Sequence, residues 1–310
     1  MTSIALSNET FTEEAKPPLA EWRVLADTNL PGAYSMALDD VILESVIAGG
    51  LATVRFYTWQ PATLSLGVNQ PLREIDRDEV ARRGFGLVRR LTGGRAVLHQ
   101  HELTYSVIAR ENDPRVSGGV IESYRKISAA LVDGLRSLGV DATLAEPSKA
   151  MFRAMAESRR AAEGLDDADE MSVGTAAHGA VCFDASSAYE VTVGKLKLVG
   201  SAQARRGGAL LQHGSILLDV DWDAWVSVFA YASAAGKERA YGKLPTRMTS
   251  LRQELGRVIT KEEVQTVLIP SFERILNVSL NPGKLSVDEK AEALRLAKDK
   301  YSSEKWTAKI

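Results

Sequence analysis

The sequence predicts an α+β fold, in which a domain of intermixed strands and helices is followed by a small helical unit. Strand-like and helix-like segments follow one another without the strict alternation of a parallel α/β protein. A long amphipathic helix at 120–138 interrupts the strands, and beyond residue 250 helix-capping signals replace strand signals. The 310 residues suffice for one large domain or two smaller ones.

The first half of the chain contains the better-defined elements. Helices are predicted at 33–45, 76–83 and 120–138, and Gly139 supplies the stop signal for the last of them. Strands are expected where short apolar runs are bounded by turn residues. These runs cover 22–25, 54–59, 63–68, 86–90 and 103–110.

The second half resumes with strands and closes with helices. Thr260 with Glu263, and Ser286 with Glu289, have capping-box spacing and each open a helix with apolar residues on one face. Pro270 is expected to end or kink the first of these helices. Strands are predicted at 188–193, 196–200, 209–212 and 215–220.

This pattern divides the chain into three parts. Residues 1–19 form a polar leader, residues 20–250 form the main domain and residues 251–310 form the helical unit. Within the main domain, 147–179 is rich in alanine and in charges of both signs and has little apolar periodicity. Because a structureless loop of this length is uncommon in a compact domain, we expect an insertion or a mobile segment there.

The composition excludes several classes of protein. Lys and Arg number 38 against 40 Asp and Glu, so no global positive field exists to hold nucleic acid or an anionic membrane. One cysteine rules out an internal disulfide framework and suits a reducing compartment. The first residues lack the basic and apolar regions of a signal peptide, and no apolar run approaches a bilayer span. We therefore expect a soluble cytoplasmic enzyme.

The segment RRLTGGRAVLH, from Arg89 to His99, lies between two predicted strands. Gly93 and Gly94 would let the backbone approach a ligand and present N–H groups to it. Together with Arg89, Arg90 and Arg95, they suit a phosphate or carboxylate. The alternative is a hairpin turn that needs positive φ, flanked by solvated arginines. The segment is neither a Walker A loop nor a GxGxxG loop.

Lys195 and Lys197 lie two apart on a predicted strand and therefore on the same face. We expect Lys195 to be solvated. Small residues follow Lys197, which leaves room either for a ligand or for a close-packed backbone crossing. Cys182, fifteen residues before Lys197, is either a small buried apolar residue or a nucleophile that a nearby cation activates.

The histidines offer a weaker signal. His99 and His101, with Cys182 as a third ligand, would make a zinc site. Gln100 and Glu102 argue against it, because they indicate a half-exposed strand end.

Three further polar residues lie in apolar surroundings. His213 follows an apolar run and either lines a pocket or is a hydrogen-bonded structural residue. Asp39 and Asp40, in the predicted helix 33–45, are expected to form part of a helix face and not an acid/base pair.

Three long stretches, RRLTGGRAVLHQHELTYSV, CFDASSAYEVTV and KLKLVGSAQARRGGALLQHGSILLDVD, together resemble the lipoate-protein ligase and octanoyltransferase family. The similarity runs in the same order over about 22–306, and several long motifs in register are far more specific than one. The resemblance implies the fold shared with biotin protein ligases, a mixed β-sheet packed by helices around an acyl-chain tunnel. The setting of Cys182, CFDASSAYE, is similar to that of the cysteine-dependent, ligase-like octanoyltransferases.

The resemblance also implies site residues. Cys182 and Lys197 match the family's catalytic positions, with Cys182 as nucleophile. The substrate-binding positions are Arg89, Arg90, Thr92, Gly93, Gly94, Arg95, His99, Gly200, Ser201, Gln203 and His213.

The implied activity is transfer of an octanoyl group from acyl carrier protein to a lysine of a lipoyl domain or of glycine-cleavage H protein. The group passes through a cysteine thioester, with no metal or cofactor. An ATP- and Mg²⁺-dependent lipoate ligase and an octanoyl amidotransferase between lipoyl domains remain open. Both protein partners are acidic. Basic residues expected to steer them are Arg89, Arg90, Arg205, Arg206 and Arg247.

Overall fold

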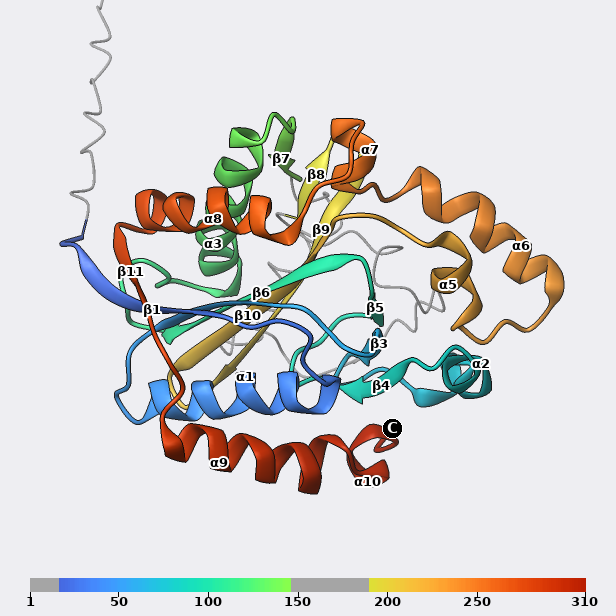
Figure 1. Ribbon diagram of the computed structural model, residues 1–310, viewed down its shortest axis with the longest axis horizontal. Coiled ribbons are helices and arrows are strands. Elements are labelled where there is room, and N and C mark those ends of the chain that lie inside the picture. Colours follow the sequence, from blue (N-terminus) through green and yellow to red (C-terminus); the bar gives the residue numbers. More distant parts are fainter. Residues whose placement is uncertain (1–16, 146–189) are drawn as a thin grey trace, which may run out of the picture.

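The computed structural model describes residues 17–145 and 190–310 (Figure 1). Most of the expected leader and the whole of the expected insertion at 147–179 lie outside the described residues. Within the described part, the strands form one sheet of eight strands and one of three.

The large sheet is mixed. Its strands are β1 (Ala20–Ala26), β2 (Thr53–Tyr57), β6 (Glu102–Arg110), β7 (Ala142–Leu144), β8 (Val191–Val193), β9 (Leu196–Arg206), β10 (Ala209–Leu217) and β11 (Val278–Pro282). They are ordered β11-β1-β2-β6-β10-β9-β8-β7. β11, β1 and β2 are parallel, and the pairs from β2 onward are antiparallel.

The small sheet consists of β3 (Thr63–Leu66), β4 (Gly86–Arg89) and β5 (Val97–His99). β3 lies in the middle, parallel to β4 and antiparallel to β5. The loop from β4 to β5 carries Gly93 and Gly94. This arrangement places the glycine loop at the edge of a short sheet beside the large one (Figure 1).

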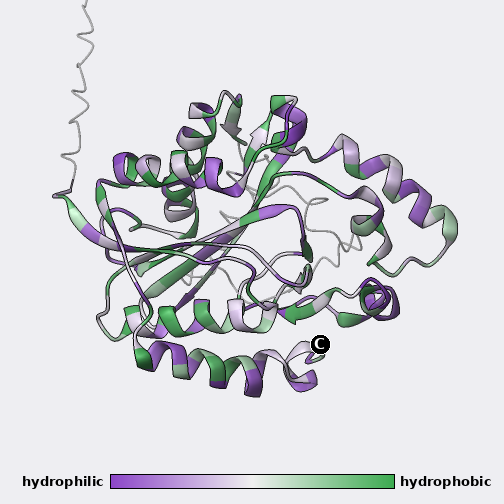
Figure 2. Cartoon of the chain, viewed as in Figure 1, coloured by the Kyte–Doolittle hydropathy of each residue, from purple (hydrophilic) through white to green (hydrophobic). Residues whose placement is uncertain are grey.

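Two layers of helices cover the large sheet (Figure 1). α3 (Val120–Ser137) and α8 (Lys261–Leu276) pack together on one face, and α1 (Gly32–Ile47) with α9 (Val287–Leu296) covers the other. Because α1 lies between the sheet and α9, eleven of its sixteen residues are buried. Figure 2 shows α1 largely apolar along its length, whereas the outer helix α9 carries hydrophilic residues.

Shorter helices complete the described structure. They are α2 (Arg77–Arg82), α5 (Trp222–Ser227), α6 (Ala234–Lys243), α7 (Leu251–Leu255) and α10 (Glu304–Thr307), with a π-helical turn at Ala297–Tyr301 and 3₁₀ turns at Leu72–Glu74 and Leu244–Thr246. None of the helices in the described ranges combines the length and hydropathy that crossing a bilayer requires.

The predicted α+β class, with a mixed sheet packed by helices and helices at the C-terminal side, is confirmed. The segments 209–212 and 215–220 are predicted as two strands, but 209–217 forms the single strand β10, because Gly214 pairs in register with Ser201, and 218–220 lies beyond its end. β5 and β7 have three residues each, too few for a periodic signal. The predicted helical unit also contains β11, which joins the large sheet beside β1.

Helix α8 continues through Pro270 to Leu276, so of the two expected effects of Pro270, an end or a kink, the end of the helix is wrong. Contacts with helix α3 and with the core stabilise the helical turn that follows Pro270. The Ser271 hydroxyl donates a hydrogen bond of 2.7 Å to the Ala130 carbonyl in α3, and Phe272 is fully buried in the core. These tertiary contacts offset the backbone hydrogen bond that proline cannot make.

Candidate active site

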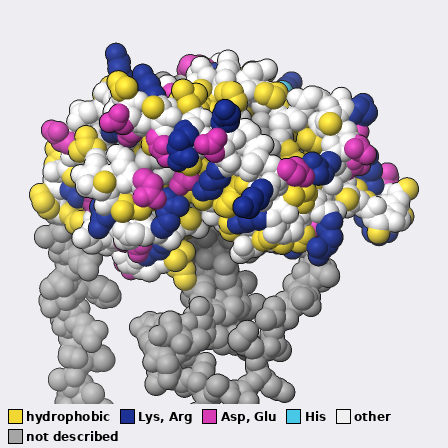
Figure 3. All heavy atoms as spheres, turned by 90° about the horizontal axis from the view of Figure 1, so that it is seen from below, with side chains coloured by type: hydrophobic (Ala, Val, Ile, Leu, Met, Phe, Trp, Pro, Cys, Tyr) yellow, Lys and Arg dark blue, Asp and Glu magenta, His cyan; other side chains and the backbone are white. Residues whose placement is uncertain are grey.

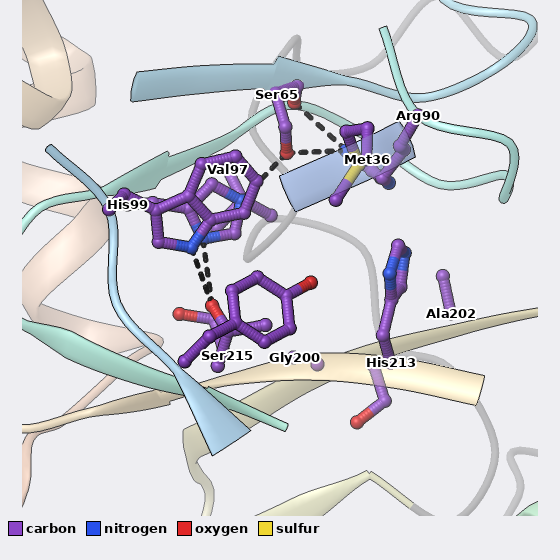
Figure 4. A pocket seen from close by; sticks show the side chains of 14 residues that line it. Met36, Ser65, Arg90, Val97, His99, Gly200, Ala202, His213 and Ser215 are labelled. Atoms are coloured by element: carbon purple, nitrogen blue, oxygen red, sulfur yellow. Dashed lines mark hydrogen bonds between the residues drawn. The ribbon is translucent and has the colours of Figure 1, made fainter. Parts of the chain in front are cut away.

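A pocket lies where the small sheet meets the middle of the large sheet (Figure 4). Aromatic and aliphatic groups alternate with a few polar ones, as is usual for a site that binds a small organic group. It is lined by Met36, Tyr57, Trp59, Ser65, Arg90, Val97, His99, Thr104, Gly200, Ser201, Ala202, His213, Gly214 and Ser215.

The small residues that follow Lys197 form one wall of this pocket. Gly214 on β10 pairs with Ser201 on β9, and a Cβ at Gly214 would lie 2.4 Å from the Ser201 hydroxyl oxygen. The same Cβ would lie 2.7 Å from the ring of Tyr105, whose hydroxyl donates a hydrogen bond of 2.8 Å to Ser201. The wall is therefore both close-packed and part of the pocket.

The glycine loop is a tight turn with buried arginine beneath it. Gly94 has a φ of 86°, as the alternative interpretation required, but the loop is not a hairpin turn, because β4 and β5 lie on opposite sides of β3. The Arg90 guanidinium donates to the carbonyl oxygens of Gly93 at 2.7 Å, Arg95 at 2.8 Å and Ser65 at 2.9 Å. Arg90 thus shapes the loop and also lines the pocket.

Arg89 lies below the loop and outside the pocket lining. Its guanidinium donates to the carbonyl oxygens of Gly67 and Gln70, both at 2.7 Å, and of Thr307, at 2.7 and 3.0 Å. Burial lowers the pKa of this guanidinium. Arg95 is half-buried and paired with Glu74 at 3.0 Å.

Arg89 and Arg90 are buried, so the interpretation of solvated arginines and the expectation that these two steer partners are both wrong. A guanidinium has five donors, and loop carbonyls turned inward satisfy them here. Arg205 is paired with Glu111 and Arg206 with Asp40, and the side chain of Arg247 is exposed. On the face seen from below, Lys and Arg side chains alternate with Asp and Glu (Figure 3).

His213 connects the loop to helix α1. Its Nε2 lies 2.7 Å from the Thr92 hydroxyl, and its Nδ1 lies 3.0 Å from an Asp39 carboxylate oxygen. Asp39 also accepts hydrogen bonds from Arg55 at 2.8 Å and from the Tyr57 hydroxyl at 3.0 Å. Burial opposes ionisation of Asp39, but the bond with His213 and the charge of Arg55 outweigh it and lower its pKa.

The expectation that Asp39 and Asp40 simply occupy a helix face therefore needs correction. Both carboxylates are buried, Asp39 beside the pocket and Asp40 against Lys300 and Tyr301. The reason is that α1 is covered on both sides, so a polar residue in it must find partners inside the protein.

His99 is stacked on Trp59, with ring centroids 4.0 Å apart, and its Nε2 lies 2.8 Å from the Ser65 hydroxyl. Burial lowers the pKa of His99, against the opposing charge of Glu102. Glu102 itself is buried and accepts hydrogen bonds from Thr104 and Ser215, so it does not mark a half-exposed strand end.

Of the three residues considered as zinc ligands, Cys182 lies outside the described residues. His101, the other histidine considered as a zinc ligand, is exposed. Within 17–145 and 190–310, no three His, Cys, Asp or Glu side chains are arranged to hold a metal ion.

Lys197 is buried on β9, and its ammonium forms an ion pair with the buried carboxylate of Glu190. Its backbone N–H donates to the Arg247 carbonyl at 2.9 Å, and its carbonyl accepts from Thr249 at 3.0 Å. Lys195 is exposed in the turn before β9, as expected. The spacing of the two lysines placed them on the same face of a strand, whereas in the structure Lys197 is buried and Lys195 is exposed.

Gln203 lies on β9 beyond the pocket. Its side-chain amide donates to the Ser123 hydroxyl and to the side-chain amide oxygen of Gln212, both at 3.1 Å. β8 pairs with β9 only as far as Val199, so this half of β9 is partly exposed. The structure thus brings Arg90, His99, Gly200, Ser201 and His213 together in the pocket lining, with Thr92 in contact through His213.

The comparisons with known proteins agree with this geometry. A model of the lipoyl protein ligase A/B catalytic domain matches residues 31–273. The chain belongs to the lipoyl protein ligase A/B family.

Its relatives in this family point to acyl transfer. Octanoyltransferase LipM of Geobacillus kaustophilus is 41% identical over 93% of this chain and 98% of that protein. Octanoyltransferase LipM of Bacillus subtilis is 38% identical over 93% of this chain and 98% of that protein. The chain is therefore an acyltransferase, and the activity that these relatives support for it is octanoyl transfer in lipoate biosynthesis.

Solved structures share the fold. A bipartite lipoate protein ligase of Thermoplasma acidophilum is 24% identical, with a TM-score of 0.74 over 94% of this chain and 98% of that chain. A lipoate-protein ligase A bound with ATP is 25% identical, with a TM-score of 0.68 over 93% of this chain and 98% of that chain.

Cys182, the expected nucleophile, lies outside the described residues. The sequence reasoning missed the site roles of Asp39 and Glu190. For Asp39 a signal existed, because a carboxylate in the middle of the apolar stretch SMALDDVIL has to be buried with a partner. For Glu190 the signal was weaker, since a strand start often carries a solvated acid.

Proposed function

We propose that this chain moves an octanoyl group from acyl carrier protein to a lysine of a lipoyl domain or of glycine-cleavage H protein, in the cytoplasm. The group travels as a thioester on Cys182, and Lys197 assists both transfers. The reaction needs no ATP, because the first step exchanges one thioester for another. The relatives named octanoyltransferases support the acyl group, and the pocket supports a site for its chain.

The observation that carries the proposal is the buried Lys197–Glu190 ion pair. Removing two charges from water is costly, so a buried ion pair adds little net stability, and its position on a strand of the pocket supports a functional role. Lys197 lies on β9, the strand that contributes Gly200 and Ser201 to the pocket wall. The sequence has its single cysteine fifteen residues earlier.

In the first step, the Cys182 thiolate attacks the carbonyl carbon of the octanoyl thioester. A new C–S bond forms, the old C–S bond breaks, and the carrier thiolate takes up the proton that Cys182 released. In the second step, the neutral amine of the acceptor lysine attacks the Cys182 thioester. A C–N bond forms, the Cys182 sulfur leaves, and the proton of the amine passes to it. The Lys197 ammonium stabilises the thiolate in both steps.

The pocket offers apolar surface to the hydrocarbon chain of the octanoyl group. Burying seven methylene-sized groups contributes about 5–6 kcal/mol, at roughly 0.8 kcal/mol each, before the costs of association are subtracted. Met36, Tyr57, Trp59 and Val97 supply apolar surface for this burial.

The test is an incubation of the purified protein with octanoyl-acyl carrier protein in the absence of ATP, followed by intact mass and a peptide map. We expect one octanoyl adduct on Cys182, transferable to an apo lipoyl domain and absent in Cys182→Ala. Modification of the acceptor only with lipoate, ATP and Mg²⁺ would instead make the protein a ligase. Transfer only from octanoylated H protein would make it an amidotransferase.

A further inference from the structure

Segment 304–310 contacts Arg89, the last residue of β4 before the glycine loop, and Trp306 is 217 residues from Arg89 in the chain. The indole N–H of Trp306 donates a hydrogen bond of 2.8 Å to the Arg89 carbonyl. The Thr307 carbonyl accepts two hydrogen bonds from the Arg89 guanidinium. Arg89 is therefore held through both its backbone and its side chain at the point where β4 enters the loop.

Trp306 is itself fixed to the layer of helix α1. Its ring meets that of Tyr301 edge to face, with centroids 6.0 Å apart, and the ammonium groups of Lys300 and Lys309 lie 4.5 and 4.2 Å from its centroid. Tyr301 and Lys300 each donate a hydrogen bond of 2.8 Å to Asp40, on α1. The cation–π contacts with Lys300 and Lys309, together with the hydrogen bond to the buried Arg89 carbonyl, restrict the indole to one orientation.

From Arg89 the contacts continue to the pocket. The Arg89 guanidinium holds the turn at 67–70, and this turn supports the loop. The Val68 N–H donates to the Thr92 carbonyl at 2.8 Å. Gly67 packs so closely on the loop that a Cβ there would lie 1.9 Å from the Gly94 carbonyl oxygen. A shift of Arg89 would therefore move both Thr92 and the adjacent pocket residue Arg90.

We propose that Trp306 is a positioning residue for the acyl site, acting through Arg89 on the loop 90–95. Its N–H sets the position of the Arg89 backbone, and segment 304–310 thereby fixes the loop wall against which the octanoyl group binds. The proposal deepens the proposed function and rests on it for the identity of the ligand. The contact between Trp306 and the loop does not depend on that identity.

The decisive variant is Trp306→Phe, which keeps an aromatic ring and removes the N–H donor. Trp222→Phe is the matched control, because Trp222 is also half-buried and no indole hydrogen bond is found for it in the described structure. In a Cys182→Ala background, which prevents turnover, the dissociation constant of octanoyl-acyl carrier protein is measured. We expect Trp306→Phe to raise it about three- to tenfold, the effect of one hydrogen bond, and Trp222→Phe to leave it within twofold.

Hydrogen exchange of the loop supplies an independent measurement. We expect the peptides that cover 66–72 and 90–97 to exchange faster in Trp306→Phe than in Trp222→Phe, at an unchanged melting temperature. Unchanged donor affinity and unchanged exchange would overturn the proposal, as would a lower melting temperature with normal affinity. If the wild-type protein binds no octanoyl donor while the exchange difference is present, the proposed function fails and the coupling of Trp306 to the loop stands.

Discussion

Asp39 is the residue whose placement changes the interpretation of the site most. It is buried and joins Arg55, Tyr57, Ser106 and His213. An ionised carboxylate only accepts hydrogen bonds, so the proton on His213 faces Asp39 and the other ring nitrogen faces Thr92. Asp39 thereby sets which nitrogen of His213 meets the loop.

Replacing Asp39 by Asn is expected to destabilise the protein by about 3 kcal/mol at pH 7, because Arg55 loses a buried counter-charge. Asp39 has a pKa below its ordinary value of 3.8, so its ionised form stabilises the fold above that pH. The stability difference between wild type and variant should therefore shrink as the pH falls below about 4. Urea unfolding at pH 7 and pH 3 measures this, with the exposed Asp288→Asn as control. A difference independent of pH would contradict the prediction.

Lys197 and Lys195 offer a matched pair two residues apart, one buried and one exposed. Lys197→Met is expected to slow octanoyl transfer by about 10² or more, because the proposed thiolate loses the cation that stabilises it. Lys195→Met should transfer at the wild-type rate. Single-turnover transfer from octanoyl-Cys182 to an apo lipoyl domain distinguishes them. Equal rates for both variants would remove Lys197 from the mechanism.

At the scale of elements, the pocket depends on how closely β9 and β10 approach each other. Gly214 has no room for a side chain, since a Cβ would meet the Gly200 carbonyl oxygen at 2.7 Å as well as the Ser201 hydroxyl. The two strands would have to separate to accept even a methyl group. The glycine in β10 therefore serves packing of the pocket wall and not a turn.

Gly214→Ala is expected to destabilise the fold by about 1–3 kcal/mol through overpacking, and to weaken binding of the octanoyl donor. Gly242→Ala in α6 is the control, because a Cβ there meets nothing within 4 Å and alanine favours a helix. Denaturant unfolding of both variants measures the difference. Similar free energies of unfolding for the two variants would show that the strands adjust without cost.

The prediction of helices and strands succeeded where it rested on residues close together in the sequence, and it failed where tertiary packing determines whether a helix continues. The capping boxes at Thr260 and Ser286 are both present in the structure, because their atoms lie within four residues of one another. α8 passes through Pro270 because contacts with α3, more than a hundred residues earlier in the sequence, hold the following turn. A local rule for proline contains no information about that partner.

At the scale of the whole molecule, one polar network spans three layers. Thr92 in the loop between β4 and β5 of the small sheet, His213 in the large sheet and Asp39 in α1 are joined by direct hydrogen bonds. Asp40, the neighbour of Asp39, joins α1 to Lys300 and Tyr301 in the outer layer. The acyl site is therefore assembled between layers, and residues far from the pocket contribute to its shape.

The sequence by itself determined the α+β class, most strands and helices, the family and the residues of the glycine loop, because periodicity and contiguous motifs are local properties. It could not assign the burial of Arg89 and Arg90, the ion pair of Lys197 with Glu190 or the contact of Asp39 with His213. Only the tertiary structure decided these, because each depends on which distant backbone carbonyls and carboxylates the packed layers bring within hydrogen-bond distance.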